Sequence, residues 1–230
     1  MIKQKNKKLA VIGAGNAGCV SALHFRQYLP ELEIDLYHDS EHHPIERVGQ
    51  GTTIPVANLI SETLDFNWFN NPISATIKTG ILYSGGWGKK NLNFFHDFYS
   101  MDQVAIHLTP KKLSDAVLSS GLFNVKEQEI NDPEKEIDAD FIIDCRGRKN
   151  IDKDNINKLV NPLNSVLLAS LPKKEMIWTE SIAHPNGWCF CVPVEDKLSL
   201  GYLYNADLTS KEEATKDFQE RFGVEEIEHS

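Results

Sequence analysis

The sequence predicts an α/β protein in which a parallel βαβ layer is interleaved with an antiparallel sheet. Two observations predict this fold. An apolar run at residues 9–12 leads into a glycine-rich loop and a helical pattern, which is the order of a buried parallel strand, a tight turn and a crossover helix. Residues 165–204 hold successive strand-like segments at hairpin spacing, which is typical of an antiparallel sheet.

The loop after the first strand has the pattern G-x-G-x-x-G, formed by Gly13, Gly15 and Gly18. In this pattern the first glycine permits the tight turn, the second lets the backbone approach a pyrophosphate, and the third allows close packing of the helix. The helix expected at residues 16–28 would direct the free N–H groups at its start toward the phosphates. The predicted cofactor contacts are Gly13, Gly15, Asn16, Ala17 and Gly18. A dinucleotide site is therefore predicted, with a purely structural turn as the alternative.

A residue that binds a ribose is expected just after the next strand, at residues 33–37. Asp39 lies at about the distance from the glycine loop at which an acidic side chain takes a ribose hydroxyl. A solvated turn over residues 39–41 is the alternative interpretation. A nucleotide loop this close to the first residue is commoner in FAD proteins than in NAD dehydrogenases, which favours FAD by analogy.

The rest of the chain alternates between helical and strand patterns. Helices are expected at residues 56–64, at 109–120 with Thr109 as cap and Pro110 as first helical residue, and at 210–222. Strands are expected at 79–84 and 93–99 as a hairpin, at 123–130, at 140–147 as a parallel strand, and at 165–171, 176–183, 188–194 and 198–204. We expect a discontinuous, Rossmann-like FAD-binding domain over 1–64 and 101–150, and an antiparallel substrate-side domain over 65–100 and 151–230.

Composition and charge narrow the class of partner. The chain has 230 residues, of which 41% are hydrophobic, and this is enough to form a real core. Its formal net charge of −9 would repel nucleic acid. No apolar run has the length needed to span a bilayer, and no signal peptide precedes the first strand. A cytoplasmic protein with neither a membrane nor a nucleic-acid partner is expected.

Cysteines and histidines suggest two metal hypotheses, each with a simpler alternative. The cysteines lack the regular loop spacing of a disulfide framework, and Cys189 and Cys191 would share one face of a strand without the spacing of a zinc site. His38, His42 and His43 could bind a metal, but a solvated polar loop is the simpler interpretation. No metal site is therefore predicted.

Six motifs occur in order along the chain. They are V-I-G-A-G-N-A-G at 11–18, V-G-Q-G-T-T-I-P at 48–55, I-K-T-G-I at 77–81, F-F-H-D-F at 94–98, A-D-F-I-I-D-C-R-G at 139–147 and G-W-C-F-C-V-P at 187–193. Together they resemble the flavin-dependent tryptophan halogenase family. The resemblance runs from about residue 9 to 223, which is nearly the whole chain.

The resemblance implies a chemistry. In this family a separate flavin reductase delivers reduced FAD, which with oxygen oxidises a halide ion to hypohalous acid. The acid travels through a tunnel to an aromatic, indole-like substrate, where a lysine holds or accepts it. The motif match assigns this role to Lys78. The role needs a cation or hydrogen-bond donor, which orients the reagent beside the electron-rich ring. An exposed strand lysine is the alternative interpretation.

The motif matches also assign the remaining site residues. On the flavin side they are Gln50, which replaces the usual acidic residue, with Thr52, Ile54, Pro55, Asp144 and Gly147. On the substrate side they are His96, Phe98, Trp188 and Phe190, the last of which replaces the family's second tryptophan. For His96 the alternative is a satisfied core histidine, and for Phe98 it is ordinary packing.

The resemblance implies a C-terminal part that this sequence lacks. Members of the family continue beyond the helix at 210–222 into a segment that supplies the halide pocket, a glutamate partner of the lysine and contacts to the flavin ring. Residues 224–230 form an acidic tail that cannot substitute. We expect an abbreviated member or one completed by a second chain. Three functions stay open: a halogenase, a flavin monooxygenase without halide chemistry, and a non-catalytic flavin- or partner-binding protein.

Overall fold

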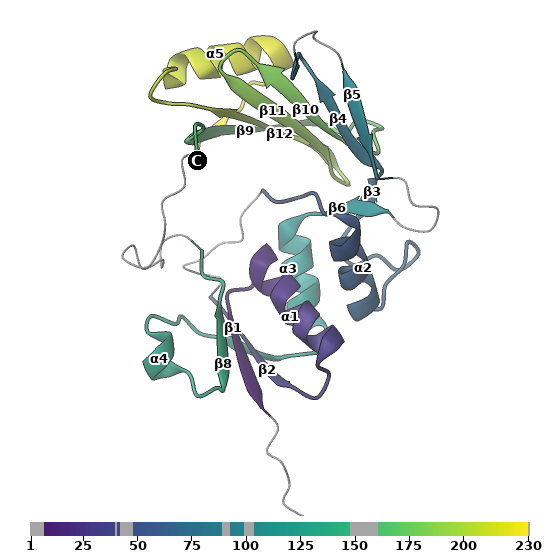
Figure 1. Ribbon diagram of the computed structural model, residues 1–230, viewed down its shortest axis with the longest axis vertical. Coiled ribbons are helices and arrows are strands. Elements are labelled where there is room, and N and C mark those ends of the chain that lie inside the picture. Colours follow the sequence, from purple (N-terminus) through teal and green to yellow (C-terminus); the bar gives the residue numbers. More distant parts are fainter. Residues whose placement is uncertain are drawn as a thin grey trace, which may run out of the picture. The chain divides into compact units, whose positions relative to one another are not determined.

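The computed structural model describes residues 7–39, 41, 48–88, 93–98, 104–147 and 161–229. The chain divides into two compact units (Figure 1). Unit 1 comprises residues 1–50, 55–74 and 108–156, and unit 2 comprises residues 51–54, 75–107 and 157–230. Among the described residues, these bounds assign 51–54, 65–74 and 104–107 differently from the division expected from sequence. The flavin and substrate roles of the two units stay predictions.

Unit 1 is built on a parallel sheet, as predicted. Its strands are β1 (Lys8–Ile12), β2 (Glu33–His38), β7 (Asn124–Glu127) and β8 (Phe141–Asp144), in the order β7-β2-β1-β8. Every neighbouring pair is parallel. The central strand β1 is buried from Leu9 onward, which matches its continuous apolar run. Strand β7 is shorter than the segment predicted at residues 123–130.

Three helices of unit 1 lie where the sequence predicts helices, and a single helical turn at residues 133–136 was not predicted (Figure 1). They are α1 (Asn16–Tyr28), α2 (Ile54–Thr63), whose first residue belongs to unit 2, α3 (Pro110–Ser119) and the single turn α4 (Pro133–Glu136). Helix α1 has the predicted bounds and packs beside α3. Thr109 occupies the N-cap position of α3 and Pro110 begins the helix, but the Thr109 side chain makes no capping hydrogen bond.

A buried carboxylate joins three strands of this sheet. Asp35 on β2 is 1% exposed, and its Oδ2 atom lies 3.0 Å from Lys8 Nζ on β1 and 2.6 Å from Lys126 Nζ on β7. Burial alone would raise the pKa of Asp35, but hydrogen bonds from Lys126, Lys8 and Asn124 outweigh it, so the pKa lies below its ordinary value. The ionised carboxylate is therefore part of the folded state.

The lowered pKa of Asp35 predicts how stability depends on pH. A carboxyl group whose pKa is lower in the folded than in the unfolded state adds stability above the unfolded value of about 3.9, and this contribution is lost as the pH falls through the folded pKa. We expect D35N to have a lower Tm at pH 7 and a shallower loss of Tm as the pH falls below about 4. Thermal melts monitored by circular dichroism would measure both, and parallel curves for the two proteins would contradict the expectation.

Unit 2 is built on a seven-stranded sheet with the order β13-β9-β12-β11-β10-β4-β5. The strands are β4 (Gly80–Ser84), β5 (Phe94–Asp97), β9 (Ser165–Pro172), β10 (Thr179–His184), β11 (Gly187–Pro193), β12 (Lys197–Tyr204) and β13 (Glu228–His229). The pairs are antiparallel, as expected, except that β10 and β4 are parallel. That parallel pair was not predicted, because it joins two hairpins that are distant in sequence.

Helix α5 (Lys211–Phe222) covers one face of this sheet (Figure 1). Ser210 and Glu213 form a capping box at its start. Phe218 packs in an apolar core that contains both Cys189 and Cys191. The two cysteines therefore share a face, as predicted, and their role here is packing. All four cysteines are free thiols.

The other face of the sheet carries aromatic side chains. Successive residues of a strand point to opposite faces, so Trp188 and Phe190 point away from the face that Cys189 packs against α5. Tyr83 of β4 pairs with Phe94 of β5 on one side and with Ser181 of β10 on the other. Ser181 in turn pairs with Phe190 of β11, so the side chains of Tyr83, Phe94 and Phe190 share one face of the sheet. We call this surface, with Tyr83, Trp87, Phe94, His96, Phe98, Trp188 and Phe190, the aromatic face.

A separate two-stranded ribbon, not predicted from sequence, completes unit 2. Strand β3 (Thr76–Lys78) pairs antiparallel with β6 (Ala105–His107), with Thr76 opposite His107 and Lys78 opposite Ala105. Strands of three residues are too short to produce a readable alternation. This register places Lys78 and His107 on the same face of the ribbon.

The described part of the chain contains no helix that is long and apolar enough to cross a membrane. The metal hypothesis for His38, His42 and His43 lies partly outside the described residues, because only His38 is among them. Elsewhere in the described ranges, no group of three or more His, Cys, Asp or Glu side chains is placed to hold a metal ion.

Candidate functional site

In the glycine loop of unit 1, close backbone packing leaves no room for a side chain at Gly13 and Gly18, whereas Gly15 has open space around it. Gly13 has a φ of 101°, and a Cβ atom there would lie 2.6 Å from the Cys145 carbonyl oxygen. A Cβ atom on Gly18 would lie 1.7 Å from the Gly13 carbonyl oxygen. At Gly15 an added Cβ atom would meet nothing within 4 Å, and its φ is an ordinary −71°. Gly15 therefore presents an open backbone surface at the start of α1.

The start of α1 can accept an anion. Gly15 is the N-cap residue, no side chain caps the helix, and no acidic residue lies in the first turn. The exposed Ala17 leaves that turn uncovered. The first N–H groups of a helix lack intrahelical partners and carry a partial positive charge, so they favour a phosphate. This end of the helix fits the diphosphate of a dinucleotide.

Asn16 joins the glycine loop to the V-G-Q-G motif within unit 1. Its Nδ2 atom donates hydrogen bonds to the carbonyl oxygens of Gly49 at 2.9 Å and Val48 at 3.4 Å. Gly49 has a φ of 84°, and a Cβ atom there would lie 2.4 Å from Asn16 Nδ2. The neighbouring Gln50 is buried, and its carbonyl oxygen accepts from Leu108 N at 2.8 Å. The glycine loop and the V-G-Q-G motif, both assigned to the flavin, therefore lie side by side.

The acidic candidates of unit 1 have partners from the protein. Asp39 Oδ1 accepts from the backbone N–H of Glu41 at 3.1 Å, which is the local turn considered as the alternative for this residue. Asp144 Oδ2 lies 2.6 Å from Arg146 Nη2, and hydrogen bonds from Arg146 lower the pKa of Asp144.

Two further residues of unit 1 were assigned to the flavin. Gly147 has a φ of 83°, and Pro55 is exposed in the first turn of α2. Cofactor roles for these residues stay predictions.

Lys78 lies at the centre of the second cluster, in unit 2. It is 6% exposed, so the interpretation as an exposed strand lysine is wrong. Its Nζ atom donates to the carbonyl oxygen of Thr52 at 3.0 Å and lies 5.0 Å from the centre of the Phe98 ring. Burial lowers the pKa of Lys78. Within the described ranges, no carboxylate forms a salt bridge with this amine.

Thr52 is held in place by the ribbon. Its Oγ1 atom is 3.1 Å from the carbonyl oxygen and 3.0 Å from the amide nitrogen of Ile106, and its own N–H donates to the same carbonyl at 2.9 Å. Its carbonyl oxygen is therefore fixed beside Lys78 Nζ. Ile54, two residues further on, is half-buried at the start of α2.

His107 is a residue of this cluster that sequence reasoning missed. It is fully buried, and its Nε2 atom lies 2.9 Å from Thr179 Oγ1. A Cβ atom on Gly51 would lie 3.2 Å from Lys78 Nζ and 3.8 Å from both the His107 ring and Thr179 Oγ1. The amine, the imidazole and the hydroxyl therefore converge around one glycine. No sequence signal marks His107, because it lies in a three-residue strand remote from Lys78 in sequence.

The charge state of His107 provides a test of this cluster. Burial, together with the charge of Lys78, lowers the pKa of His107 to about 3, so the imidazole is neutral at pH 5. Because Lys78 contributes to the shift, K78M is expected to raise the pKa of His107. Titration of the imidazole by ¹H–¹⁵N NMR would measure it. An unchanged pKa in K78M, or a ring that titrates near 6.5 in the wild-type protein, would contradict the geometry.

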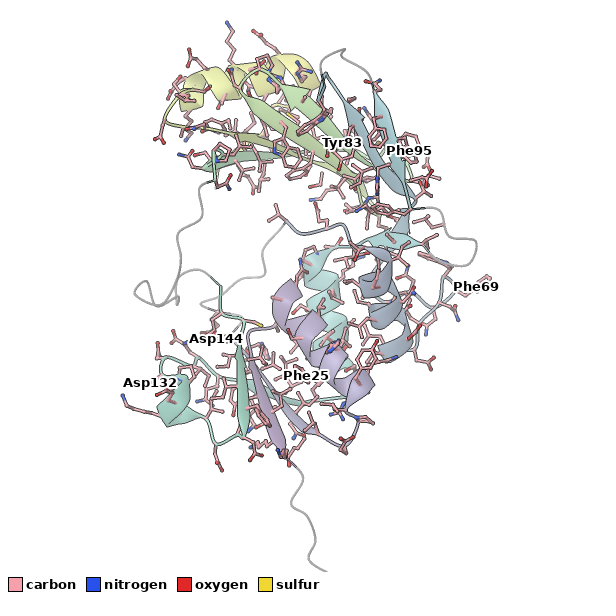
Figure 2. The ribbon with its side chains drawn as sticks, viewed as in Figure 1. Phe25, Phe69, Tyr83, Phe95, Asp132 and Asp144 are labelled. Atoms are coloured by element: carbon pink, nitrogen blue, oxygen red, sulfur yellow. The ribbon has the colours of Figure 1, made fainter. Side chains whose placement is uncertain are left out.

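The substrate-side residues lie along the aromatic face. His96 is exposed on β5, so the interpretation as a core histidine is wrong. Its ring lies 5.6 Å from that of Phe98, and Trp188 lies 6.3 Å from Phe190. An open groove of about 500 Å³ is lined by Tyr83, Trp87, Gly88, Phe94 and His96. Figure 2 labels Tyr83 on β4 and Phe95 on the neighbouring strand β5, whose side chains point to opposite faces of the sheet. Binding roles for His96, Phe98, Trp188 and Phe190 stay predictions.

Comparisons with known proteins agree on one family. The family model described as tryptophan halogenase matches residues 8–112 and 111–229. A tryptophan 6-halogenase from Streptomyces toxytricini has a TM-score of 0.80 and 17% identity over 99% of this chain and 64% of that one. The tryptophan 5-halogenase MibH has a TM-score of 0.81 and 17% identity, over 100% and 59%. A tryptophan halogenase from Shewanella frigidimarina has a TM-score of 0.78 and 17% identity, over 100% and 63%. This chain thus spans less than two thirds of these structures.

Proposed function

The chain belongs to the tryptophan halogenase family, and from this premise we propose that it is a flavin-dependent halogenase of an electron-rich, indole-like aromatic substrate. The observation that carries the proposal is the position of Lys78. A buried amine with one backbone hydrogen bond and an aromatic ring 5.0 Å away can orient a small oxidant beside a substrate ring.

Unit 1 would bind the FAD cofactor. The open backbone at Gly15 and the uncapped start of α1 would take the diphosphate, and the buried Oδ1 atom of Asn16, which lacks a hydrogen-bond partner, offers an acceptor nearby. When bound in its reduced form, FAD supplies with oxygen the oxidising power that converts a halide ion to hypohalous acid. A separate flavin reductase would deliver the reduced cofactor.

Unit 2 would direct the reagent to the substrate. The amine of Lys78 has donors beyond the one that Thr52 occupies, and these can hold the oxygen of hypohalous acid. Because the amine is buried, its interaction with a polar reagent is stronger than it would be in water. Phe98 and His96 would stack on the aromatic ring to be halogenated and hold it near this amine. That a second chain completes this site is also a prediction.

Two measurements test the proposed function. Absorbance spectra of the purified protein with FAD should show binding at micromolar concentration. A reaction with indole, bromide, oxygen, FAD and a flavin reductase should then yield bromoindole in proportion to bromide. Flavin binding with an oxygenated product independent of bromide would support a monooxygenase, whereas flavin binding without any product would support a non-catalytic role. Failure to bind flavin would contradict both enzymatic functions and would leave only a partner-binding role.

A further inference from the structure

The aromatic face continues beyond the residues assigned to the ring that reacts. We propose that the groove of Tyr83, Trp87 and Phe94 is a second binding position, which takes an uncharged aryl group of a substrate larger than free tryptophan. This inference rests on the proposed function, because the groove would extend the substrate site of the same enzyme. It assigns binding roles to three side chains that the sequence motifs left without one.

A continuous series of ring contacts joins this groove to Lys78. It starts at Phe98, whose ring centre is 5.0 Å from Lys78 Nζ. The successive ring-centre distances are 5.6 Å from Phe98 to His96, 6.3 Å from His96 to Phe94, 6.0 Å from Phe94 to Tyr83, 5.9 Å from Tyr83 to Trp87 and 6.0 Å from Trp87 to Trp188. All lie in the range of favourable aromatic pairs. A ligand with two aryl groups can therefore contact rings along its whole length.

The groove is exposed and yet ordered by the sheet. Phe94 is 57% exposed and Trp87 is 47% exposed, which leaves large apolar surfaces facing solvent. The Trp87 indole is fixed because its Nε1 atom donates to the Ser181 carbonyl oxygen at 2.8 Å. The groove of about 500 Å³ falls within the size range of small-molecule sites.

The described lining of the groove favours an uncharged occupant. Among the residues that the structure describes, the groove is lined by Tyr83, Trp87, Gly88, Phe94 and His96, and none of these five is Asp, Glu, Lys or Arg. An ammonium and a carboxylate placed against these five side chains would lose hydration without gaining an ion pair from them. Free tryptophan carries both charges next to its indole ring, whereas an amide-linked tryptophan carries neither. The occupant is therefore an uncharged aryl group.

Strand β5 offers a matched control. Phe95 neighbours Phe94 in sequence and is 42% exposed, but it pairs with Leu82 and contacts Trp178 on the opposite face at a ring distance of 6.3 Å. Figure 2 labels Phe95 on β5 and Tyr83 on β4. F94A removes a ring from the groove, and F95A removes a comparably exposed ring from outside it. Both positions are exposed enough for the fold to persist, which circular dichroism would verify.

Calorimetric titration of the full chain tests the proposal with four ligands: indole, L-tryptophan, N-acetyltryptophanamide and N-acetyltryptophan benzylamide. We expect the benzylamide to bind about tenfold more tightly than the amide, because a second aryl group finds its own contacts. F94A should remove this gain while changing the affinity for the amide less than about twofold. F95A should leave both affinities unchanged, and L-tryptophan should bind more weakly than either neutral ligand.

Three results would overturn the proposal: L-tryptophan binding as tightly as the benzylamide, equal effects of F94A and F95A, or no gain from the second aryl group. The titration needs no flavin, halide or turnover. A protein that shows the expected affinities but does not halogenate would therefore contradict the proposed function and leave the second binding position supported. A protein that brominates indole but shows no preference for the benzylamide would support the proposed function and contradict the second binding position.

Discussion

K78M is expected to lower the rate of halogenation by at least about 10²-fold while leaving FAD affinity unchanged. Loss of one preorganised donor at a reacting group costs about 10²- to 10³-fold in other enzymes. Because Lys78 is buried and forms no salt bridge within the described residues, removal of its charge should leave the Tm equal or higher. The measurements are the initial rate of bromoindole formation, an FAD titration and a thermal melt.

The matched control is K111M. Lys111 lies on α3 with a side chain that is 65% exposed and an exposed partner, Asp115. Its replacement should leave rate, FAD affinity and Tm close to those of the wild type, because exposed ion pairs contribute little. A structural role for Lys78 would be indicated if K78M lowered the Tm and reduced the rate only in proportion to the loss of folded protein. Full activity in K78M would exclude the catalytic role.

Alanine at Gly15 and at Gly18 is expected to separate cofactor binding from folding. A Cβ atom on Gly15 meets nothing within 4 Å and the backbone there has an ordinary φ of −71°, so G15A should keep the wild-type Tm. If the diphosphate approaches this backbone, the new methyl group should weaken FAD binding by at least about tenfold. Fluorescence quenching of FAD and thermal melts would measure the two effects independently.

G18A should instead lower the free energy of unfolding. Its Cβ atom would lie 1.7 Å from the backbone oxygen of Gly13, and neither α1 nor the loop can move away without loss of packing. Overpacking against rigid backbone belongs to the mechanisms that cost more than about 4 kcal/mol. A stable G18A protein would contradict the close approach of helix and loop. A stable G15A protein with wild-type FAD affinity would show that the loop is structural and binds no diphosphate at this position.

Local patterns account for the elements that could be predicted. The bounds of α1 follow from the glycines before it and the helical period after it, and the hairpin of β4 and β5 follows from two apolar runs around a glycine-rich turn. The family resemblance likewise depends on contiguous motifs, and the match over residues 8–229 confirms it. The ribbon of β3 and β6 could not be predicted, because strands of three residues carry almost no periodic signal.

The amino-acid sequence alone specified the alternation of strands and helices, the nucleotide-type loop, the family and the choice of Lys78, because each depends on neighbours within a few residues or on motif order. Tertiary structure decided the environments: the burial of Lys78, its hydrogen bond to Thr52, the neutral His107 beside it and the rings that run from Phe98 to Trp188. Those properties depend on strands paired across long stretches of chain. Desolvation and ring contacts arise only when such distant segments meet, so no local pattern encodes them.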